Sequence, residues 1–80
     1  MWTSSGGKMH TRDAQGMLKG LGPAAGSSRM TNLAVDGAWG PLSSAAMKDF
    51  QSLKGIPTTG SVGPDDADTL FATWQAAGSP

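Results

Sequence analysis

The chain has 80 residues and a formal net charge of zero, with six basic and six acidic residues. Its scattered Lys and Arg form no basic run for nucleic acid or an anionic membrane, and the absence of cysteine excludes disulfides and Cys-ligated zinc. No apolar stretch approaches the ~20 residues that span a bilayer. We therefore expect one small domain with neither nucleic acid nor membrane as its partner.

Residues 1–11 are rich in Gly and Ser and have no apolar periodicity, so we predict a flexible N-terminal arm. Trp2 either folds back on its own domain or anchors the arm in a neighbouring subunit, because Trp is common at interface hot spots. His10 is the only histidine, and we expect no metal or catalytic role for it. The domain itself is predicted over residues 12–77, with a short tail at 78–80.

A first helix is predicted over residues 12–21. Thr11 is a suitable N-cap, and Asp13 lies in the first turn, where its charge complements the helix dipole. Apolar residues at steps of three and four form one stripe: Ala14, Met17, Leu18 and Leu21. Gly22-Pro23 should end this helix. A loop is expected over residues 23–34, in which Arg29 is either a solvated cation or a contact for a carboxylate or a partner.

The centre of the sequence is a turn motif that occurs twice. Its two copies lie 23 residues apart: Asp36-Gly37-Ala38-Trp39-Gly40-Pro41 and Thr59-Gly60-Ser61-Val62-Gly63-Pro64. In each, a glycine can adopt the positive φ of a turn, and a proline at the first helical position starts a helix. Trp39 and Val62 should point inward. A repeated unit of this kind predicts an internal pseudo-twofold structure.

Two further helices follow the turns. We predict helices over residues 41–54 and 64–77, each with one buried apolar stripe. In the first, the stripe comprises Leu42, Ala45, Ala46, Phe50 and Leu53, with Met47 at its edge and Asp49 facing away; in the second, it comprises Ala67, Leu70, Phe71, Trp74 and Ala77. Three aspartates near the start of the last helix (65, 66 and 68) are better explained by the helix dipole than by calcium, whose usual loop ends in a Glu that this chain lacks. The expected fold class is therefore all-α, a small three-helix bundle.

The ordered series of motifs resembles the peptidoglycan-binding domain 1 family. The resemblance covers about residues 14–70 and rests on Ala14-Gln15-x-x-Leu18-x-x-Leu21-Gly22, the first turn with its following Phe50-Gln51, Gly55-Ile56, and the second turn, where Thr59 stands in place of the family's usual Asp. It implies a three-helix fold with pseudo-twofold repeats, a non-catalytic role, and attachment to the bacterial cell wall through peptidoglycan stem peptide or glycan.

Candidate ligand-binding residues follow from the turns. The polar groups of Asp36, Thr59 and Ser61 could contact the wall polymer, while the amides of Gln15 and Gln51 could either contact it or brace the turns. Trp39 could form an apolar wall of the site, but together with Phe50 it fits the core better. No combination of residues suggests catalysis, a metal site or a cofactor.

The sequence is also compatible with a second function. The same fold could be a structural subunit of a larger assembly such as a phage virion, held to its neighbours through Trp2 and Arg29. Residues 1–8 lack the apolar segment of a secretory signal. The expected location is accordingly either the cell wall or a virion.

Overall fold

A computed structural model describes residues 10–77. In this range the chain forms helices α1 (Thr11–Ala25), α2 (Ser28–Thr31), α3 (Pro41–Lys54) and α4 (Pro64–Ala76), and contains no strand. The predicted all-α class is confirmed, although a fourth, short helix joins the expected three. Among these elements there is no helix with the length and apolar character needed to cross a membrane. Trp2 and the tail at 78–80 lie outside the described residues, as does all but the end of the predicted arm.

α1 is longer than predicted at its C-terminal end. It continues through Gly22-Pro23 and is capped by Gly26, and the N–H of Ser27 donates to the carbonyl of Gly22 at 3.1 Å. A Cβ atom at Gly22 would collide with the backbone and hydroxyl of Thr31. Gly22 therefore serves the close packing of α2 on α1, and the prediction that it ends the helix was wrong. His10, rather than Thr11, is the N-cap, and the backbone N–H of His10 donates to the Asp13 carboxylate at 3.3 Å.

α2 lies within the segment that was predicted to be a loop. Its N-cap is Ser27, whose hydroxyl accepts from the N–H of Met30 at 3.2 Å. Met30 of α2 and Leu33, which follows the helix, are both buried in the core. Lys19 of α1 fixes the exit from α2 by donating to the carbonyls of Thr31 and Leu33, at 3.0 and 3.3 Å.

α3 has the predicted bounds, but a different face is buried. Phe50, Met47 and Ala46 are fully buried, whereas Leu42 is 76% exposed and Leu53 is 58% exposed. This face is buried because Ser43 and Gln51 also point inward. The Ser43 hydroxyl accepts from the Gln15 amide of α1, and the Gln51 amide accepts from the N–H of Gly60 in the second turn. The predicted stripe was therefore wrong at Leu42 and Leu53.

α4 also buries less than predicted. Ala67 and Leu70 are fully buried and Trp74 is partly buried, but Phe71 is 41% exposed and Ala77 is exposed. Its N-terminus is capped by the Asp66 carboxylate, which accepts from the N–H of Gly63 at 3.1 Å.

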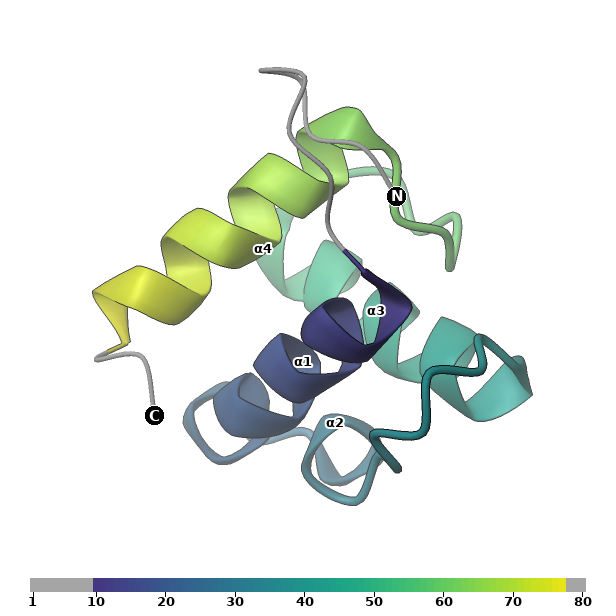
Figure 1. The fold of residues 1–80 in the computed structure, drawn as a ribbon. Coiled ribbons are helices and arrows are strands. Elements are labelled where there is room, and N and C mark those ends of the chain that lie inside the picture. The colour runs from purple at the N-terminus through teal and green to yellow at the C-terminus, as the bar shows by residue number, and fades with distance from the viewer. Residues whose placement is uncertain (1–9, 78–80) are drawn as a thin grey trace.

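α1 is the central helix of the fold. It packs against each of the other three, and α2 also packs against α3. In Figure 1, α4 and α2 lie on opposite sides of α1, with α3 behind. The core that results draws on every helix, so the two turns at the starts of α3 and α4 are held on a common scaffold.

Candidate functional site

The first turn is held by Gln15, a fully buried side chain of α1. Its Oε1 accepts from the backbone N–H groups of Gly37 (2.8 Å) and Asp36 (3.2 Å). Its Nε2 donates to the carbonyl of Ala38 (2.8 Å), to the Asp36 carboxylate (3.2 Å) and to the Ser43 hydroxyl (2.9 Å). The amide therefore has its hydrogen-bonding capacity filled within the protein.

The second turn is held in the same way by Gln51 of α3, also fully buried. Its Oε1 accepts from the N–H of Gly60 (2.9 Å), and its Nε2 donates to the Thr59 hydroxyl (3.1 Å) and the Ser61 carbonyl (3.0 Å). These three partners stand 23 residues after Gly37, Asp36 and Ala38, so the sequence repeat is also a repeat of hydrogen bonds. Gln15 and Gln51 are buried braces, and the alternative prediction that their amides contact a ligand does not fit this burial.

Thr59 performs in the second turn what Asp36 performs in the first. The Asp36 carboxylate accepts from the N–H of Ala38 at 3.0 Å, and the Thr59 hydroxyl accepts from the N–H of Ser61 at 3.2 Å. Either side chain closes a turn by bonding the backbone two residues on. Replacing a carboxylate by a hydroxyl therefore keeps the turn but removes a charge from its surface.

Trp39 joins the two turns. It is partly buried against the core, and its indole N–H donates to the carbonyl of Gly60 at 3.2 Å. Phe50 is fully buried. The core assignment therefore holds completely for Phe50 and in part for Trp39.

The Asp36 carboxylate is exposed, and its pKa is lowered. The largest cause is the hydrogen bond from the Ala38 N–H, followed by the one from the Gln15 amide, since both stabilise the ionised form. Asp36 therefore presents a negative charge at neutral pH.

Two adjoining hollows lie between the α2 segment and the start of α3, and we call them together the α2–α3 groove. One, of about 330 Å³, is lined by Ser28, Arg29, Asn32, Leu33, Leu42 and Ala45. The other, of about 180 Å³, is lined by Leu33, Ala34, Asp36, Ala38, Gly40, Pro41, Leu42 and Ser43. Because Leu33 and Leu42 line both, the groove has an apolar middle, with Arg29 in one part and Asp36 in the other.

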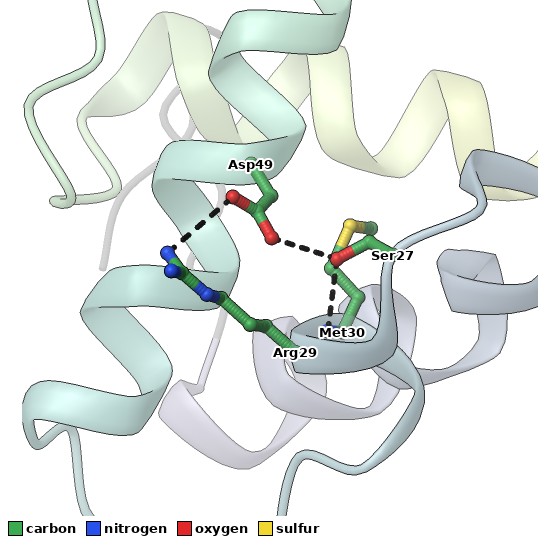
Figure 2. A network of polar contacts seen from close by, with 4 residues as sticks. All are labelled: Ser27, Arg29, Met30 and Asp49. Carbon is green, nitrogen blue, oxygen red and sulfur yellow. Dashed lines mark hydrogen bonds and ion pairs between the residues drawn. The ribbon is translucent and has the colours of Figure 1, made fainter.

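The end of the groove at Arg29 is shaped by a small polar network. Figure 2 shows Asp49 of α3 pointing toward α2, where its carboxylate accepts from the Ser27 hydroxyl at 2.8 Å and lies 3.8 Å from the Arg29 guanidinium. Asp49 thus ties α3 to α2, although the apolar pattern placed it on the outward face. The Arg29 side chain stays 65% exposed.

The structure distributes the other predicted site residues around the second turn. Thr59 lines a separate hollow of about 350 Å³, together with Ile56, Pro57, Asp65, Asp66 and Thr69. Ser61 is exposed, and its carbonyl accepts from Gln51. Among the predicted site residues that lie within residues 10–77, only Asp36 and Arg29 line the α2–α3 groove, so these residues do not form one site. Leu42 and Asn32 also line the groove but were not among the predicted site residues, and Leu42 was assigned to the buried stripe of α3.

Within residues 10–77 there is no group of three His, Cys, Asp or Glu side chains placed to hold a metal ion.

Comparison with protein families adds one finding. The model of the family described as "Putative peptidoglycan binding domain" matches residues 10–70 of the chain. Neither a curated protein nor a solved structure gave a match. The matched segment contains both turns, both glutamine braces and the α2–α3 groove. Because the match extends over most of the chain, the chain belongs to the peptidoglycan-binding domain family.

Proposed function

We propose that this chain is a non-catalytic module that attaches to the bacterial cell wall by binding peptidoglycan stem peptide in the α2–α3 groove. One observation carries the proposal: the groove combines the exposed cation of Arg29 on α2, the exposed carboxylate of Asp36 in the first turn and an apolar middle between them. Binding sites for small ligands have this composition, with apolar walls and a few placed polar groups.

The charges of the groove suit the chemistry of a stem peptide. Such a peptide carries carboxylates, backbone amides and small alkyl side chains. Arg29 can pair with a carboxylate, because its existing contact with Asp49 is long and exposed and therefore weak. Asp36, which is ionised at neutral pH, can accept from an amide or an ammonium group.

Leu42 supplies the apolar contact. It is 76% exposed, so a ligand over it would remove most of its side chain from water. Burying a leucine is worth about 1.5–3 kcal/mol, which is a large share of the free energy of a micromolar complex.

The other predicted residues contribute indirectly. Gln15 and Trp39 hold the first turn in place, and Gln51, Thr59 and Ser61 build the second turn, to which Trp39 is bonded. We assign them a positioning role in the proposed site.

Co-sedimentation with purified cell-wall sacculi tests the proposal. The wild-type chain should pellet with sacculi, and Leu42→Ala should weaken binding about tenfold, the equivalent of about 1.4 kcal/mol. Leu53→Ala is the matched control, because Leu53 lies on the same helix and is 58% exposed but does not line the groove. Arg29→Ala should also weaken binding, whereas Lys54→Ala removes one positive charge outside the groove and should not.

The results separate the possible roles. Equal binding of sacculi by Leu42→Ala and Leu53→Ala would show that the wall polymer does not bind in the α2–α3 groove. If the wild-type chain does not pellet but assembles into oligomers or particles, the role of a structural subunit, for instance in a virion, replaces wall binding.

A further inference from the structure

A second hollow lies on another face of the fold, between α1 and α4. It measures about 260 Å³ and is lined by Arg12, Asp13, Gly16, Met17 and Trp74. We call it the α1–α4 cleft. It shares no lining residue with the α2–α3 groove.

Gly16 opens this cleft. It lies inside α1, where glycine costs about 1 kcal/mol relative to alanine. Within residues 10–77, a Cβ atom built on it meets no other atom within 4 Å. Among the described residues, neither packing nor backbone conformation requires glycine here, so what its missing side chain provides is the space of the cleft.

The wall opposite Gly16 is aromatic. Trp74 is only partly buried, and its ring lies 6.1 Å from that of Phe71, at an interplanar angle of 32°. This pairing is within the range of favourable aromatic contacts, so Phe71 helps to fix the indole. Phe71 is itself 41% exposed. α4 therefore keeps a supported aromatic surface in contact with water.

The charged residues of the cleft select the kind of ligand. Arg12 offers N–H donors, and Asp13 offers carboxylate acceptors. An ammonium group would be attracted by Trp74 and Asp13 but repelled by Arg12, and a carboxylate would be attracted by Arg12 but repelled by Asp13. A neutral ligand with both hydroxyl groups and an apolar face fits all three side chains.

We infer that the α1–α4 cleft binds a pyranose ring of the β-1,4-linked N-acetylated glycan strand of the wall polymer. The C–H face of such a ring stacks on an indole, and its hydroxyl and acetamido groups both donate and accept hydrogen bonds. The hollow is slightly smaller than the ~300–1,000 Å³ of drug-sized sites, which suits a single ring. This inference rests on the proposed function and extends it: glycan and stem peptide of one polymer would be bound on different faces.

Titration of the ¹⁵N-labelled full-length chain with chitotetraose, which has the sugar backbone but no stem peptide, tests the inference by NMR. The indole N–H signal of Trp74 and the amide signal of Gly16 should shift, while the indole signal of Trp39 should not. Gly16→Leu should weaken binding at least tenfold, because its side chain fills the cleft. It should also melt at the same or a higher temperature, since leucine favours the helix more than glycine does.

Gly16→Ala and Leu42→Ala complete the design. Alanine should reduce binding of chitotetraose less than leucine does, and Leu42→Ala should bind it like the wild-type chain. Absence of shifts, or unchanged binding by Gly16→Leu, overturns the inference. The proposed function can fail independently of this inference. If Leu42→Ala binds sacculi as well as the wild-type chain does, the α2–α3 groove is not the wall-binding site, but a response to chitotetraose would still support the α1–α4 cleft.

Discussion

The indole N–H of Trp39 donates to the backbone carbonyl of Gly60 at 3.2 Å, and this bond joins the two copies of the repeated turn. The copies are 23 residues apart in sequence, and each is braced by its own glutamine. The Trp39–Gly60 contact therefore makes one unit of two local structures, and its loss should reduce the stability of the whole domain.

Trp39→Phe should lower the free energy of unfolding by about 1–2 kcal/mol, because the Gly60 carbonyl loses its donor while most of the apolar contact is kept. Urea denaturation monitored by circular dichroism measures the change. Trp74→Phe makes the same substitution on the partly exposed surface of α4 and should cost less. Equal losses in the two variants would contradict a special role for the bond between the turns.

Gln51→Leu should destabilise the domain by about 3 kcal/mol. Leucine has a similar size, but it leaves the buried N–H of Gly60 without a partner, and an unsatisfied buried group costs about 1–3 kcal/mol. Gln15→Leu should lower the free energy of unfolding by a comparable amount, because Gly37, Ala38 and Ser43 lose their hydrogen bonds to the amide. The control is Gln75→Leu on the exposed surface of α4, which should change the free energy of unfolding by less than about 0.5 kcal/mol. A small effect at Gln51 would mean that water satisfies the turn as well as the amide does.

These contacts explain which features of the fold could be predicted from the sequence. The turns and the starts of α3 and α4 were predictable, because the glycines and prolines that define them act within a few residues. The buried face of α3 was not predictable from the apolar pattern, because apolar residues occur on several of its sides. The hydrogen bonds of Ser43 and Gln51, to partners 8 to 28 residues away in sequence, decide which face is buried. α2 was missed because four residues are too few to show a period.

The candidate site was predictable only in part for the same reason. Asp36, which lines the proposed groove, could be named as a candidate from the sequence because a local turn motif contains it. The groove beside it depends on Leu42 being exposed, which is a consequence of the face that α3 buries. The bracing role of Gln15 and Gln51 was one of two open interpretations, and only their burial decides between them.

The lowered pKa of Asp36 predicts how stability changes in acid. Because the folded-state pKa lies below that of the unfolded chain, the stabilising contribution is fully present above the unfolded-state pKa of about 3.9, and it is lost as the pH falls through the folded-state value. In Asp36→Asn the side-chain oxygen can still accept hydrogen bonds from Ala38 and Gln15, but the group cannot ionise. The melting temperature of this variant should therefore fall less than that of the wild-type chain between pH 5 and pH 2. Parallel curves for the two proteins would show that the Asp36 carboxylate is not linked to folding.

Gly60 and Gly55 allow a matched test of the second turn. Both have positive φ angles, of 77° and 69°, so alanine at either position should cost about 1–2 kcal/mol for the left-handed backbone alone. At Gly55 a Cβ atom meets no atom of the described part of the chain within 4 Å, whereas at Gly60 it would collide with the Ser44 hydroxyl and lie 3.0 Å from Cε of Lys48. Gly60→Ala should therefore cost about 1–3 kcal/mol more than Gly55→Ala.

Removing the obstructing hydroxyl separates the two causes. In the Ser44→Ala background, Gly60→Ala should recover a part of the extra loss, and the coupling free energy from the double-mutant cycle gives its size. Gly55→Ala should show no coupling to Ser44→Ala, since its site is open. If Gly60→Ala and Gly55→Ala cost the same, and neither couples to Ser44, then the second turn does not pack against α3 at Gly60 and the positive φ angle alone explains the glycine.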